Sequence, residues 1–145
     1  MTSLPTGICE ALVQDAPDAI IYADAEGIIR LWNRGAERMF SFAAAEALGR
    51  CLDLIIPERL RDRHWDGYGR VMQSGVSRYG TGDLLAVPGL RKDGSRLSLE
   101  FTIVPFRGDD GRICGIAAIL RDVTRRFDEM KELRRQLAAA SRPAS

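Results

Sequence analysis

Apolar and polar positions alternate with different periods along the chain, and this divides its first part into a helix and a hairpin. Apolar residues between Ile8 and Gln14 recur at helical spacing, which predicts a short amphipathic helix. Residues 18–23 and 28–32 are rich in β-branched and aromatic side chains and flank the turn sequence Asp24-Ala-Glu-Gly27. We therefore predict an antiparallel hairpin over residues 18–32.

Helical patterns follow the hairpin. Asn33 is a suitable N-cap for one short helix, and a second short helix over residues 43–48 is stopped by Gly49. A longer helix is predicted between Pro57 and Gly75, because proline suits a first helical turn and glycine suits the left-handed position after the last one.

The chain then returns to strand patterns over residues 79–87, 96–103 and 113–120, with turns at 91–94 and 108–111. Apolar residues of 96–103 alternate strictly with polar ones, so one face of that strand is expected to be buried. The run 113–120 is apolar on both faces and should be a central strand. Two strands, then helices, then three strands predict an α+β fold: a five-stranded antiparallel sheet with helices on one face.

The last helical pattern carries apolar residues at spacings of three and four between Phe127 and Leu137, among many charged residues. Such a short amphipathic helix needs a packing partner, and we expect it to form a coiled coil in a homodimer through the terminal helices. We predict a helical lead-in over 1–14, one globular domain over 15–122, the C-terminal helix over 123–140 and a disordered tail over 141–145.

Composition narrows the functional classes. The 145 residues carry a formal net charge of +1 and no basic block interleaved with aromatic residues, so we predict no nucleic-acid partner. A long apolar run and a basic leader are both absent from the sequence, which favours a cytoplasmic protein with no membrane segment. Cys9, Cys51 and Cys114 are widely spaced and are interpreted as reduced thiols.

The most distinctive candidate for a functional side chain is the single histidine, His64, which lies within the predicted long helix. It shares an apolar stripe with Leu60 and Tyr68, whereas Arg59 and Arg63 fall mainly on the other side. A lone histidine on such a stripe is commonly a core residue. The sharper interpretation is an axial ligand to the metal of a cofactor.

Five short motifs together resemble those of PAS domains, over roughly residues 8–124. They are Asp24-x-x-Gly27, Trp32-Asn33, Gly49-Arg50, Arg91-Lys-Asp-Gly94 and Leu120-Arg-Asp-Val-Thr124. The resemblance implies a PAS fold in which helices and the inner sheet face enclose a ligand pocket. It also implies that Asp122 and Thr124 couple the sheet to a C-terminal signalling helix.

Residues 56–70 are similar to the proximal helix of haem-binding PAS sensors of the rhizobial oxygen-sensing kinase type. This resemblance implies that haem b is bound, with His64 as the iron ligand and with Arg70 and Arg78 near the propionates. Neutral imidazole binds iron, and guanidinium matches a carboxylate. The predicted cofactor-binding residues are His64, Arg70, Arg78, Tyr68, Leu84, Leu85, Leu99, Phe101, Ile103 and Ile116.

One departure from those sensors changes the expected signal. They carry a distal arginine where this chain has Leu84 and Leu85. An apolar distal side has no charged donor for bound oxygen, so it should favour CO or NO, or admit a second protein ligand. Met72, Cys51 and Cys114 are the candidates for such a ligand.

Three other interpretations stay open. The same apolar pocket suits a fatty acid or an aromatic acid without haem. A flavin-binding light sensor would need a photoactive cysteine, and Cys51 lacks the usual surrounding sequence. A ligand-free dimerisation module is the third. We find no catalytic triad, phosphate loop or metal triad, so no enzymatic activity is predicted, and a separate kinase or cyclase is expected to carry the output.

Overall fold

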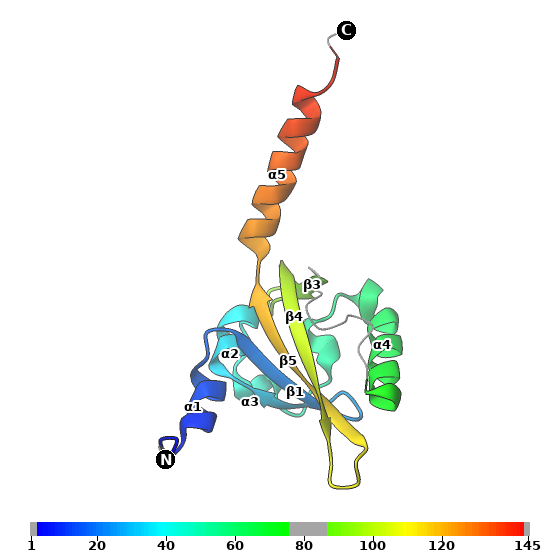
Figure 1. Ribbon diagram of the computed structural model, residues 1–145. Coiled ribbons are helices and arrows are strands. Elements are labelled where there is room, and N and C mark those ends of the chain that lie inside the picture. Colours follow the sequence, from blue (N-terminus) through cyan, green and yellow to red (C-terminus); the bar gives the residue numbers. More distant parts are fainter. Residues whose placement is uncertain (1–2, 76–86, 144–145) are drawn as a thin grey trace.

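The computed structural model describes residues 3–75 and 87–143, and these form one antiparallel sheet with helices packed against it (Figure 1). The sheet has five strands in the order β2-β1-β5-β4-β3. The strands are β1 (Ala19–Asp24), β2 (Ile29–Trp32), β3 (Val87–Leu90), β4 (Arg96–Arg107) and β5 (Ile113–Asp122). The helices are α1 (Ile8–Asp15), α2 (Arg34–Phe40), α3 (Ala44–Ala47), α4 (Arg61–Ser74) and α5 (Thr124–Ala140), with short 3₁₀ turns η1 (Leu52–Ile55) and η2 (Glu58–Leu60). The predicted α+β class and sheet are confirmed.

Strand β5 is central, as its uniformly apolar sequence predicts. It pairs with β1 on one side and with β4 on the other, so that Ala118 lies between Ile21 and Ile103. It also continues to Asp122, two residues past the predicted end. The long pairing fixes which side chains of three strands share a face.

The inner face of the sheet forms the core with the helices. Ala19, Ile21 and Ala23 alternate as buried residues along β1, and Phe40 of α2 is fully buried. Along β4, Leu97 and Leu99 are buried, whereas Phe101 and Ile103 on the same face are only half-buried. The inner sheet face is therefore buried near α2, and its side chains are more exposed to solvent farther along β4.

The edge strand β3 differs from its predicted position. Residues 79–86 of the predicted strand lie outside the described residues, and the strand that is described, Val87–Leu90, continues through Pro88 and Gly89. Proline is tolerated there because one side of an edge strand makes no ladder bonds. At Gly89 a Cβ would lie 2.6 Å from Leu99 Cδ1, so the glycine allows β3 to approach β4 closely.

The helix predicted from Pro57 is in fact a 3₁₀ turn followed by α4. Pro57 has an extended ψ of 137°, and the regular helix starts only at Arg61. The Arg61 side chain donates to the carbonyl oxygens of Ile56 (3.1 Å) and Asp53 (3.3 Å), which holds the preceding loop. The predicted end is correct, because Gly75 takes the left-handed conformation with φ 71°.

Asn33 does more than cap α2. Its Oδ1 accepts from Ala36 N (2.9 Å), as the cap prediction requires, and also from Ile20 N (2.8 Å). Its Nδ2 donates to the carbonyl oxygens of Val13 (2.8 Å) and Asp18 (3.0 Å). This fully buried amide therefore joins α1, the loop before β1, β1 itself and α2.

Helix α5 extends away from the sheet, and none of its residues is buried (Figure 1). Its apolar side chains are exposed: Phe127, Met130, Leu133 and Leu137. The amphipathic seam predicted from the sequence is thus present but makes no buried contact in the single chain. In the described part of the chain, no helix has both the length and the apolar character needed to cross a membrane.

Candidate functional site

His64 lies on the half-buried side of α4, against two aromatic neighbours. Its ring centroid is 4.7 Å from that of Trp65 and 5.8 Å from that of Tyr68. The Nδ1 atom is buried, and within the described residues it has no hydrogen-bond partner. Burial lowers the pKa of the imidazole, and the nearby Asp53 carboxylate opposes that shift only in part. The ring is therefore held neutral with an unused nitrogen.

The two aromatic neighbours attach α4 to η1 and to the end of β1. Trp65 Nε1 donates to Asp53 Oδ1 at 2.8 Å. Tyr68 OH donates to the carbonyl oxygens of Ala23 (3.2 Å) and Asp24 (2.5 Å). Burial raises the pKa of the Tyr68 hydroxyl, so it stays a donor at all ordinary pH values. These bonds hold the part of α4 that directly follows His64.

The indole of Trp65 also lies directly over Gly27. A Cβ at Gly27 would stand 2.1 Å from Trp65 Cη2, and Gly27 has a left-handed φ of 79°. The glycine is therefore required both by the turn and by the indole. This contact could not be identified from the sequence, because Gly27 and Trp65 are far apart along the chain.

We expect Gly27→Ala to destabilise the domain more than Gly94→Ala, because only Gly27 meets a side chain. Gly94 has a similar φ of 83° but nothing within 4 Å of its Cβ position. Backbone strain should cost about 1 kcal/mol in both variants, and the displaced indole about 1–2 kcal/mol more in the first. Urea unfolding followed by tryptophan fluorescence measures both. Equal losses of unfolding free energy would show that the indole contact contributes nothing.

The other predicted site residues are found in different surroundings. Leu99 and Ile116 are buried in the core, Tyr68 is buried on α4, and Phe101 and Ile103 are half-buried on the inner face of β4. Arg70 is exposed on α4. Arg78, Leu84 and Leu85 lie outside the described residues.

The residues named as possible second ligands are also separated. Met72 is half-buried on α4 and packs against the core. Cys51 is half-buried and its backbone pairs with Ile28, beside the first hairpin. Cys114 Sγ lies 3.6 Å from Tyr22 OH. Of the three, Met72 is the one on the same helix as His64.

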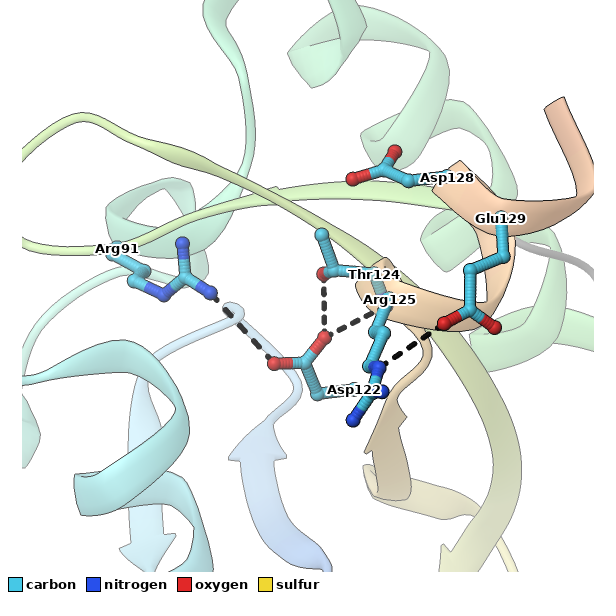
Figure 2. A pocket seen from close by; sticks show the side chains of 6 residues that line it. All are labelled: Arg91, Asp122, Thr124, Arg125, Asp128 and Glu129. Atoms are coloured by element: carbon cyan, nitrogen blue, oxygen red, sulfur yellow. Dashed lines mark hydrogen bonds and ion pairs between the residues drawn. The ribbon is translucent and has the colours of Figure 1, made fainter. Parts of the chain in front are cut away.

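A second group of polar residues lies where β5 passes into α5 (Figure 2). The Asp122 carboxylate accepts from both the amide and the hydroxyl of Thr124, and Arg91 approaches it at 3.7 Å. The Thr124 hydroxyl in turn accepts from Ser98 N at 3.0 Å, and Val123 N donates to Ser98 O at 2.9 Å. The start of α5 is thus tied to β4 as well as to β5.

These residues border a cavity of about 540 Å³ at the base of α5, lined by Arg91, Asp122, Thr124, Arg125, Asp128 and Glu129 (Figure 2). Arg125 is paired with Glu129 at 3.1 Å, and Arg126 reaches back to Glu100 of β4 at 2.8 Å. The sequence motif named Asp122 and Thr124, and the structure adds that they are hydrogen-bonded to each other. Arg91 and Ser98 were not identified as parts of this junction, because they belong to segments far away in the sequence.

Comparison with known proteins places these features in a family. A family model described as the PAS fold matches residues 13–127. The sensor protein FixL of Bradyrhizobium diazoefficiens is 30% identical over 140 residues, which cover 91% of this chain and 26% of that protein. An uncharacterised protein of Azorhizobium caulinodans is 32% identical over 126 residues, covering 86% of this chain and 17% of that protein. The chain thus spans about a quarter or less of the length of these relatives.

Solved structures agree on the fold. The PAS domain of a Colwellia psychrerythraea protein superposes with a TM-score of 0.70 at 22% identity, covering 81% of this chain and 95% of that one. An RNA-binding light-oxygen-voltage receptor gives a TM-score of 0.70 at 27% identity, covering 96% of this chain and 40% of that one.

Proposed function

Because this chain belongs to the PAS family of sensory modules, we propose that it binds haem b through His64 and responds to a diatomic gas or to the redox state of the iron. The observation that carries the proposal is the buried Nδ1 of His64 with no partner among the described residues. A buried polar atom without a partner is costly unless it has a use. The similarity to FixL, a sensor protein, adds to the argument.

The residues that are present fit this group chemically. An iron ligand must be neutral imidazole, and burial keeps His64 in that form. A rotation of the imidazole by a half-turn exchanges the positions of Nδ1 and Nε2. The orientation of the ring therefore decides which of the two nitrogens would face the iron. When bound, haem would supply the iron that takes up the gas.

The apolar side chains of β4 and β5 would determine the choice of gas. Phe101 and Ile103 are half-buried on the inner sheet face, near the buried Leu99 and Ile116. With Leu84 and Leu85 they would offer no charged donor, so CO and NO are favoured over oxygen. Arg70 and Arg78 are the proposed partners of the propionates.

The response would leave the domain through α5. Strands β4 and β5 both hold the start of that helix, through Ser98 and through the Asp122–Thr124 pairing. A shift of α4 that changes the packing of these strands therefore has a direct route to α5, and a few kcal/mol of differential contact is enough to change the populations of two states. We propose a homodimer through the terminal helices that signals to a separate kinase or cyclase. Free cysteines suit a reducing compartment, so we propose the cytoplasm.

The test is an absorption spectrum of the purified chain, expressed with a haem precursor, in oxidised, reduced and CO-bound forms. We expect a Soret band that moves on reduction and again on addition of CO. A colourless protein that also fails to take up added haem would refute the proposal. If a hydrophobic acid then raises the thermal stability and also shifts the amide signals of Leu99 and Phe101, the effector-binding alternative is correct. Without those shifts, the dimerisation module is favoured.

A further inference from the structure

A separate hollow of about 380 Å³ lies between the last turn of α4 and the hairpin that joins β4 to β5. The hollow is distinct from the surroundings of His64 and from the junction with α5. It is lined by Met72, Gln73, Arg107, Gly111, Arg112 and Ile113.

Two guanidinium groups border this hollow without an ion-pair partner in the described part of the chain. Arg107 Nη1 donates to Gly111 O at 2.9 Å, which holds its side chain across the hairpin. Its Nη2 lies close to the end of α4, since a Cβ at Gly75 would stand 2.7 Å away. The Arg112 side chain makes no hydrogen bond within the described residues, although its backbone N donates to Asp110 Oδ1 at 3.0 Å. Asp110 thus binds the hairpin backbone, and both arginines keep N–H donors for an anion.

Met72 and Ile113 supply the apolar part of the lining, beside the polar Gln73 and the backbone of Gly111. Met72 and Ile113 are half-buried, and Met72 packs on the core. Ile113 Cδ1 lies 3.5 Å from the Cβ position of Gly75, so its side chain faces α4 rather than the solvent side of the hairpin. A cationic border beside an apolar surface suits a molecule with one anionic end, and the volume lies within the usual range for small ligands.

We propose that this hollow binds an amphiphilic carboxylate. Its carboxylate is held by Arg107 and Arg112, and its apolar body packs on Met72 and Ile113. Guanidinium forks match a carboxylate bidentately, whereas an inorganic anion would leave the apolar surface unused. The site goes beyond the haem proposal and needs no contribution from His64.

The test is titration of octanoate into the full chain, followed by calorimetry and by amide chemical shifts. We expect saturable binding with shifts around Met72 and Ile113, and affinity about tenfold lower in Arg107→Gln/Arg112→Gln, because a lost charged hydrogen bond is worth about that factor. Arg38→Gln/Arg96→Gln removes the same charge from exposed arginines that have no described ion pair and should bind as the wild type does. The single variant Arg112→Gln should keep the stability of the wild type, because the Arg112 side chain makes no hydrogen bond within the described residues. It therefore tests binding without a change in folding.

Three results would overturn the proposal: no binding of octanoate, equal affinity in the two double variants, or inorganic phosphate binding as tightly as octanoate. The titration is repeated in His64→Ala, where we expect unchanged octanoate affinity. This distinguishes the two proposals, because absence of haem binding at His64 would leave octanoate binding unchanged, and absence of octanoate binding would leave haem binding unchanged. Octanol, which lacks the charge, should bind at least about tenfold more weakly than octanoate.

Discussion

Replacement of Asn33 by alanine is expected to lower the free energy of unfolding by about 3–4 kcal/mol, because four hydrogen bonds of one buried amide are lost together. Two backbone N–H groups and two carbonyl oxygens would lose their partner in a place that water does not easily reach. Urea unfolding followed by circular dichroism measures the change. The exposed variant Gln136→Ala is the control and should change stability by less than about 0.5 kcal/mol.

Asn33→Asp separates the two roles of this residue. Aspartate is as good an N-cap as asparagine, so a residue that only capped α2 would tolerate the change. Here the carboxylate would face the carbonyl oxygens of Val13 and Asp18 with no N–H to offer. We expect a loss of about 2 kcal/mol or more at neutral pH. Wild-type stability in Asn33→Asp would mean that the bonds to α1 and to the loop contribute nothing.

The second large effect follows from the proposed ligation of haem by His64. In His64→Gly, haem affinity should fall about 100-fold or more, because loss of a ligand costs at least as much as loss of its supporting hydrogen bonds. Added imidazole should restore the Soret band of the wild type by occupying the space that the side chain leaves. Optical titration with haem, with and without imidazole, measures both effects.

Asp66→Gly is the matched control for His64→Gly. It places the same glycine at an exposed position of α4, where the side chain makes no described hydrogen bond or ion pair. Its haem spectrum should keep the band positions of the wild type. Unchanged spectra and unchanged haem content in His64→Gly would show that His64 is not the ligand.

The elements that could be predicted are those specified by local sequence. Period-two alternation identifies β4, a uniformly apolar run identifies the central β5, and Gly75 marks the end of α4. Asn33 as a cap also follows from near neighbours in the sequence. Each of these depends on contacts within a few residues or on one repeating pattern. Asp122 and Thr124, by contrast, were named only through the resemblance to PAS domains.

What could not be predicted depends on contacts between distant segments. Trp65 fits over Gly27, and Ser98 bonds to Thr124, across separations that no periodicity encodes. The start of α4 at Arg61 is determined by side-chain bonds to the loop before it, although Pro57 alone suggested an earlier start. The hollow beside Arg107 exists only because the end of α4 meets a hairpin more than thirty residues later in the chain.

Strands β1 and β5 are neighbours that run in opposite directions, so Ala19, where the sheet is entered, lies opposite Leu120, two residues before β5 ends. An ion pair of 3.2 Å between Asp18 and Arg121 joins the two points. The sheet itself therefore needs only two adjacent attachment points, and α1 and α5 carry the chain away from them toward opposite ends of the molecule (Figure 1).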